Sequence, residues 1–186
     1  IEIIEAFKIA KEFSAPCHVH IRGMGNPPDK GNKLGAIESI QEVIANATIT
    51  GAALHIVHIS SVGLSVTEDL LEIVENANLN GLDITTECYP YSAGMTLIES
   101  AIFDEGWQEN LGVNYENLLW PSTGEVLNKS SFEKYRSQGG MVVVNFIPET
   151  SVIASVKSPL TSIATDGWLK NSKGHPRTSG SYAKLL

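Results

Sequence analysis

The chain has 186 residues, a length that suits one domain with a sizeable buried core. Hydrophobic residues make up 42% of the sequence and charged residues 18%, which is the composition of a folded globular protein and excludes a disordered one. The formal net charge is -8, and no basic run or basic helix face is present, so the sequence argues against a protein that binds nucleic acid or an anionic membrane.

The predicted elements alternate between helix and strand along the chain. By the spacing of apolar residues, we expect helices at 1–13, 34–48, 64–80, 130–138 and 148–156. We expect strands at 16–22, 52–60, 82–91, 141–148 and 161–168. Two stretches separate them: a loop rich in Gly, Pro and Asn over 23–33, and a connection without clear period over about 93–129. Two pairs match the capping-box spacing at helix starts, Ser65 with Glu68 and Ser130 with Glu133.

Cysteine usage and hydropathy bear on the cellular setting. The two cysteines, Cys17 and Cys88, are far apart and form no CxxC motif, so we expect reduced thiols and a cytoplasmic protein. No stretch approaches the ~20 apolar residues that span a bilayer, and no signal peptide is visible, so no membrane contact is expected. Because the sequence begins without Met and inside a helical pattern, we expect its natural start to lie upstream of Ile1.

Strands that alternate with helices imply right-handed crossovers and a parallel sheet, either doubly wound or a TIM-type barrel. No GxGxxG or GxxxxGK[ST] motif follows a strand, which removes the usual nucleotide-binding interpretation. Polar side chains favour the barrel because they gather toward the C-terminal ends of the strands, where barrel enzymes hold their chemistry. They are His20 and Arg22, His58 and Ser60, Glu87 and Tyr89, Asn145 and Glu149, and Asp166. A complete barrel has eight strands and ~250 residues, whereas five strands are counted in residues 1–186.

The HVH motif raises the question of a metal site. His18 and His20 share one face of a strand, because strand residues alternate, and both can therefore reach one ion. For such a pair alone, hydrogen-bonded core histidines are the better interpretation. His58 favours the metal site, since it ends the neighbouring strand of a barrel and also faces the rim. His55 lies on the opposite face, where packing or surface is the expected role.

Asp166 ends the last expected strand and is followed by Gly167. One interpretation is a cap for the next segment. The other is a carboxylate placed to accept a proton from a water molecule at the metal. The residues alone leave both interpretations open.

Several motifs occur in a characteristic order. They are HIR at 20–22, IVHIS at 56–60, TECYPYSAGMT at 86–96, ATDG at 164–167 and GHPRTSGSYAKLL at 174–186. This set resembles the D-aminoacylase (N-acyl-D-amino-acid deacylase) branch of the metal-dependent amidohydrolase superfamily. That branch typically shows THMR, ISH, YPY followed by small residues, SDG and HPR. The resemblance covers nearly the whole chain, and the combination is far more specific than any one motif.

The resemblance implies an α/β fold, namely the C-terminal five strands or so of a TIM-type (β/α)8 metal-dependent hydrolase barrel. The N-terminal strands, with a first-strand His-x-His and an early cysteine ligand, are then absent from this sequence. Residues 1–186 are expected to form one partial barrel domain with an irregular insertion at about 93–129.

The resemblance also implies site residues and a reaction. It makes His20 and His58 zinc ligands, for one or two ions, and Asp166 the catalytic base; His18 has no counterpart in THMR. The implied reaction is hydrolysis of a linear amide C–N bond in a small-molecule N-acyl amino acid or related amide. Tyr89 or Tyr91 is expected to hydrogen-bond the substrate's carbonyl or carboxylate.

Two arginines and one departure concern the substrate. Arg22 and Arg177 are candidates for a bidentate grip on a substrate carboxylate, with structural salt bridges as the equal alternative. Many relatives have a Lys just after the strand-five histidine, whereas Ile59, Ser60 and Ser61 follow His58 here. This departure puts the usual substrate preference in question.

Two alternatives remain open. A cyclic amide hydrolase of the hydantoinase or dihydroorotase kind would be favoured by a carbamylated Lys at the end of strand four, and no Lys occurs between Pro16 and Asp29. A non-catalytic fragment that binds metal weakly is the second. Five parallel strands leave two unpaired edges, so such a piece needs the rest of the barrel, another chain, or another copy of itself in a homo-oligomer.

Overall fold

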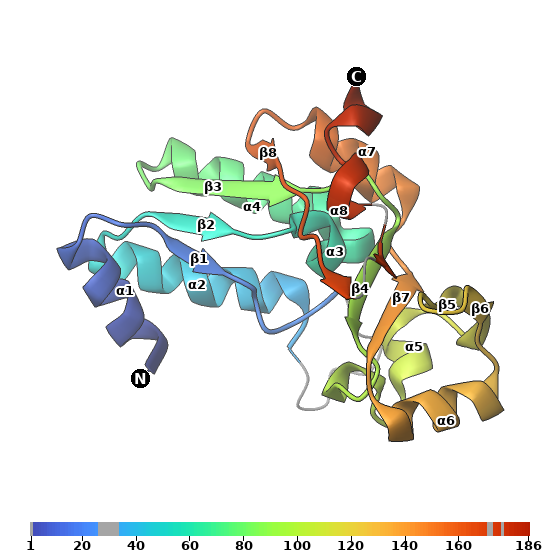
Figure 1. Cartoon of the computed structure of the whole chain (residues 1–186). Helices are drawn as coiled ribbons and strands as arrows, with labels where there is room; N and C mark the ends of the chain where they lie inside the picture. The colour runs from blue at the N-terminus through green and yellow to red at the C-terminus, as the bar shows by residue number, and fades with distance from the viewer. Residues whose placement is uncertain (1, 26–33, 171–172, 176) are drawn as a thin grey trace.

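The computed structural model describes residues 2–25, 34–170, 173–175 and 177–186 (Figure 1). Most of the loop expected over 23–33 lies outside these residues. A four-stranded parallel sheet has the order β1-β2-β3-β8. Its strands are β1 (Cys17–Val19), β2 (Leu54–Ile56), β3 (Ile84–Cys88) and β8 (Thr161–Ile163). This sheet confirms the predicted mixed α/β fold with parallel strands.

The helices of the parallel part pack on one face of this sheet. They are α1 (Glu2–Glu12), α2 (Ala36–Thr50), α3 (Ile59–Gly63) with the 3-10 turn η1 (Leu64–Val66), α4 (Thr67–Leu79) and α7 (Glu149–Lys157). Ile40 of α2, Ile56 of β2 and Leu70 of α4 are fully buried in their shared core. Because strand residues alternate, the other face carries His18, His55 and Thr85, which lie opposite one another in register.

One expected parallel strand belongs elsewhere. The run at 141–148 forms β7 (Met141–Asn145), which pairs antiparallel with β4 (Ala93–Leu97) and β5 (Leu118–Trp120) in a second sheet. The assignment of β7 to the parallel sheet, and of Asn145 to its rim, was therefore wrong. A run of Val residues that is apolar on both faces fits any strand covered on two sides, so the pattern identifies a buried strand but not its partners.

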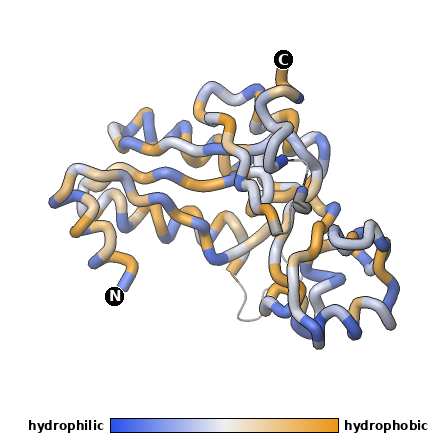
Figure 2. The backbone as a smooth tube through the Cα atoms, in the orientation of Figure 1, coloured by the Kyte–Doolittle hydropathy of each residue, from blue (hydrophilic) through white to orange (hydrophobic). Residues whose placement is uncertain are grey.

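The insertion is consequently larger and more regular than expected. Its antiparallel sheet has the order β4-β7-β5-β6 and stands beside the C-terminal ends of the parallel strands (Figure 1). The remaining elements are η2 (Ala101–Phe103), α5 (Trp107–Leu111), η3 (Tyr115–Asn117), β6 (Glu125–Val126) and α6 (Lys129–Gln138). Figure 2 shows the hydrophobic β7 next to the more hydrophilic α6. An aromatic core holds this part together, with Trp107 stacked on Phe132 and Trp120 stacked on Tyr135.

Both predicted capping boxes were wrong. The N-cap of α4 is Val66, with no side-chain hydrogen bond, because the 3-10 turn η1 leads directly into α4 and the backbone oxygen of Leu64 accepts the N–H of Thr67. Helix α6 begins at Lys129, and its capping box is formed by Asn128 and Ser131.

The chain ends in short elements above the C-terminal ends of the parallel strands (Figure 1). They are β9 (Leu169–Lys170), β10 (Lys173–Gly174), α8 (Arg177–Gly180) and η4 (Ala183–Leu185). None of the helices in the described ranges is both long enough and apolar enough to cross a membrane.

Candidate metal centre and cavity

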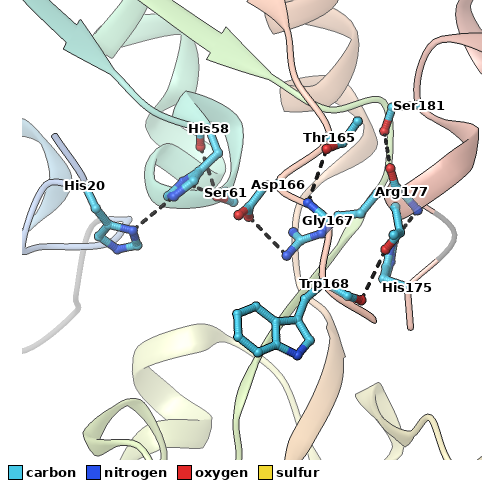
Figure 3. Close-up of polar contacts among 11 residues, drawn as sticks. His20, His58, Ser61, Thr165, Asp166, Gly167, Trp168, His175, Arg177 and Ser181 are labelled. Atoms are coloured by element: carbon cyan, nitrogen blue, oxygen red, sulfur yellow. Dashed lines mark hydrogen bonds and ion pairs between the residues drawn. The ribbon is translucent and has the colours of Figure 1, made fainter. Parts of the chain in front are cut away.

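Two histidines meet at the C-terminal ends of β1 and β2. His20 follows β1 by one residue, and its Nδ1 lies 3.0 Å from Nε2 of His58 (Figure 3). The prediction that His58 lies on the strand was wrong: β2 ends at Ile56, and His58 sits in a left-handed turn with φ 36° and ψ 53°. This turn directs the imidazole toward His20.

The spacing of the two ring nitrogens fits a zinc ion. Zinc binds imidazole nitrogen at about 2.0–2.1 Å, so two ligands of a tetrahedral site are separated by about 3.3 Å. The observed 3.0 Å is close to that separation, and without metal it is the length of an N–H···N hydrogen bond. Within the described ranges, no group of three or more His, Cys, Asp or Glu side chains converges as a finished metal site. His20 and His58 therefore offer two ligands, and further ones would come from elsewhere.

Lowered pKa values favour the neutral form of both histidines, which is the form that metal binding requires. Burial lowers the pKa of His20, and burial together with the charge of His20 lowers the pKa of His58 to about 4. The carboxylate of Asp166 acts in the opposite direction on the pKa of both rings. Asp166 is therefore close enough to both to stabilise positive charge at this site.

Asp166 forms an ion pair with the buried side chain of Arg177. It lies three residues after β8 in a left-handed conformation with φ 43°, and its Oδ2 is 3.0 Å from Nη2 of Arg177. The Arg177 side chain is only 3% exposed, and its guanidinium lies 4.5 Å from the centroid of the Tyr89 ring. Figure 3 shows Asp166 between His58 and Arg177. This ion pair fixes one carboxylate oxygen and gives Asp166 a defined orientation.

A cavity of about 870 Å³ opens in front of these side chains. One wall is the candidate site, with His20, His58, Ser61, Tyr89, Asp166 and Arg177. Much of the remaining lining comes from the insertion and combines apolar with polar and acidic side chains: Met95, Ile102, Leu111, Val144 and Phe146, and Thr96, Ser100, Asp104, Glu105 and Asn110. The volume lies within the range that holds a small organic molecule. The insertion thus completes the pocket in which the polar groups converge.

The other predicted substrate residues separate into two groups. Tyr89 lines the cavity and is 1% exposed, and burial raises the pKa of its phenol. Tyr91 instead packs against the C-terminal segment. Its ring centroid lies 5.2 Å from that of His175 and 4.2 Å from Nζ of Lys184. Arg22 lines the cavity, but its Nε lies 3.0 Å from Oε2 of Glu42 in a salt bridge.

His18 does not join the pair at the rim. Its ring lies against that of His55, with centroids 4.6 Å apart. His55 in turn hydrogen-bonds Thr85 Oγ1 at 2.7 Å and lies 3.2 Å from Oε2 of Glu87. These side chains occupy the sheet face opposite the helices. Sequence reasoning missed this second cluster because it gave His55 only a packing or surface role.

The buried His175 should make the free energy of unfolding depend on pH. It is 4% exposed, its Nδ1 accepts the backbone N–H of Arg177 at 3.0 Å, and its pKa is lowered from 6.5 to about 4, first by burial and then by Arg177 and Lys184. As the pH falls from 6.5 to about 4, the unfolded chain binds a proton that the folded chain does not, so the free energy of unfolding falls across this window and is at its full value above it. The contribution is at most about 1.4 kcal/mol per pH unit.

The variant His175→Asn separates this effect from the loss of a hydrogen bond, because the amide oxygen can still accept the Arg177 N–H. Urea unfolding measured at several pH values should show a shallower fall between pH 6.5 and 4 in the variant than in the native chain. Equal slopes in both would contradict a neutral, buried His175.

Comparison with known proteins finds solved structures that share this fold. No family model matches the sequence, and no curated protein matches it. Among solved structures, an N-acyl-D-glutamate deacylase from Bordetella bronchiseptica, complexed with zinc and a phosphonate mimic of the tetrahedral intermediate, aligns with a TM-score of 0.75 at 18% identity. The alignment covers 100% of this chain and 41% of that one. A D-aminoacylase described as defining a novel subset of amidohydrolases aligns with a TM-score of 0.73 at 18% identity, over 99% of this chain and 39% of that one.

A further D-aminoacylase structure, from work on its binuclear metal centre, aligns with a TM-score of 0.75 at 18% identity. At this level of identity, the likeness shows a shared fold. The chain spans about two fifths of the length of these solved structures. This confirms the predicted fold class, part of a TIM-type barrel of the kind found in D-aminoacylase-like amidohydrolases.

Proposed function

We propose that the chain belongs to a zinc-dependent amidohydrolase that cleaves a linear amide C–N bond in a small-molecule N-acyl amino acid. The observation that carries this proposal is the convergence of the two imidazole nitrogens, 3.0 Å apart, with Asp166 in the wall of one large cavity. The structural neighbours support it, because they are D-aminoacylases and a deacylase of N-acyl-D-glutamate.

His20 and His58 are the residues that would hold the metal, with further ligands from outside the described residues. A zinc ion in such a site lowers the pKa of bound water to about 7 and polarises a carbonyl. The chain supplies the remaining chemistry. Asp166, oriented by Arg177, accepts a proton from the attacking water and passes it to the leaving amine.

The substrate contacts follow from the same cavity. Tyr89 lies beside Arg177 and lines the cavity, which makes it the better candidate of the two tyrosines to hydrogen-bond the carbonyl or carboxylate of the substrate. Arg177 already pairs with Asp166 and Arg22 with Glu42, so any grip on a substrate carboxylate shares a guanidinium that has another partner. Tyr91, packed on the C-terminal segment, supports that segment and is the weaker candidate of the two tyrosines.

The proposal is tested by amine release from a panel of N-acetyl-D- and N-acetyl-L-amino acids, with dihydroorotate and hydantoin as cyclic controls. The expected result is hydrolysis of linear D-amides that a chelator abolishes and added zinc restores. Turnover of the cyclic amides alone would favour the hydantoinase-like alternative. Zinc binding without any turnover would favour the non-catalytic fragment.

A further inference from the structure

The Ser61 hydroxyl lies within hydrogen-bonding distance of two atoms of His58. Ser61 lies in α3, one turn after His58, and is 6% exposed. Its Oγ is 2.8 Å from Nδ1 of His58 and 2.9 Å from the backbone oxygen of His58 (Figure 3). The left-handed turn at His58 and the start of α3 at Ile59 bring these atoms together.

Counting hydrogens at Ser61 decides which ring nitrogen carries the proton. A serine hydroxyl donates one hydrogen bond and accepts two. The carbonyl oxygen of His58 can only accept, so the Ser61 hydroxyl donates to it. A lone pair of Oγ then faces Nδ1, which forms a hydrogen bond only if Nδ1 carries the proton.

We propose that Ser61 is a positioning residue that holds His58 in the tautomer with the proton on Nδ1, leaving the lone pair of Nε2 directed at His20 and at a bound metal. Metal-ligating histidines commonly have the other ring nitrogen fixed by an oxygen, which sets the tautomer and the ring orientation. The inference rests on the proposed function only in that His58 is taken as a metal ligand. The tautomer itself is a property of the metal-free chain.

The first test is the 15N NMR spectrum of the histidine rings at neutral pH without metal, in the native chain and in Ser61→Ala. The native His58 should show a protonated Nδ1 and an unprotonated Nε2, and Ser61→Ala should shift the proton toward Nε2. Ser60→Ala is the matched control, since Ser60 is an adjacent buried serine whose Oγ has no partner among the described residues. It should leave the His58 tautomer unchanged.

The second test is zinc affinity, measured by competition with a chromophoric chelator. Ser61→Ala should weaken zinc binding about 10- to 100-fold, whereas Ser60→Ala and the hydroxyl-retaining Ser61→Thr should stay close to the native value. A native His58 protonated on Nε2 would overturn the inference, and so would an unchanged tautomer in Ser61→Ala. If both tests succeed but no amide is hydrolysed, the role of Ser61 stands and the proposed function fails.

Discussion

His58→Asn is expected to remove most of the zinc affinity of the chain. Asparagine adopts left-handed backbone conformations more readily than other residues, so it suits the φ of 36° at this position. Its amide nitrogen can take the place of the Nδ1–H donor beside Ser61, but nothing in its shorter side chain reaches the position of Nε2. The variant therefore deletes one metal ligand and little else. The loss in affinity should exceed the roughly 10–100-fold that follows loss of an outer-shell partner.

The control for this variant is His55→Asn. His55 is also a buried histidine, but it lies on the sheet face opposite the helices and pairs with Thr85 and Glu87. Titration with zinc should give the native affinity for His55→Asn. Equal losses in the two variants, or a loss only in His55→Asn, would place the metal in the second cluster and contradict the site proposed here.

Asp166→Asn is expected to lower kcat for amide hydrolysis by roughly 100- to 10,000-fold, the usual contribution of a general acid–base residue. Asparagine tolerates the φ of 43° and preserves the shape of the side chain, so the substitution removes mainly the ability to take a proton. KM should change less than kcat, because the interaction is made in the reaction and not in binding.

The substitution also leaves Arg177 buried without a carboxylate, which lowers stability. Asp104→Asn removes another ion-paired carboxylate that lines the cavity, 2.6 Å from Arg136, but this pair is more exposed, so the variant should lose less stability than Asp166→Asn. Thermal unfolding of both variants shows whether each is folded at the assay temperature. A folded Asp166→Asn enzyme with native kcat would exclude Asp166 as the base.

The parallel part of the fold was predictable because its signals are local. Apolar spacing located α1, α2 and α7, and alternation located β1 and β3. The sheet partner of β7 was not predictable. Its Val residues are buried on both faces, so their pattern does not indicate whether the strand is parallel or antiparallel, or which strand it pairs with. The insertion's strands are short and its core is built from aromatic side chains contributed by several segments, so no single window shows a period.

The site was predictable in its residues more than in its geometry. The order of the motifs singled out His20, His58, Tyr89, Asp166 and Arg177, which the structure brings to one cavity. It did not show that a left-handed turn directs the His58 ring toward His20. It also did not show that Arg177 forms an ion pair with Asp166. Ser61 was visible only as a departure from the family's Lys; its position one helical turn after His58 was the available signal.

The most direct test of the proposed metal site is a crystal structure of the chain with zinc, using anomalous scattering at the zinc edge. We expect a zinc peak about 2.0–2.1 Å from both Nδ1 of His20 and Nε2 of His58, with Asp166 beside it and still paired with Arg177. A zinc ion bound instead at His55 and Glu87, or no zinc at His20 and His58 in a crystal of the folded chain, would contradict it.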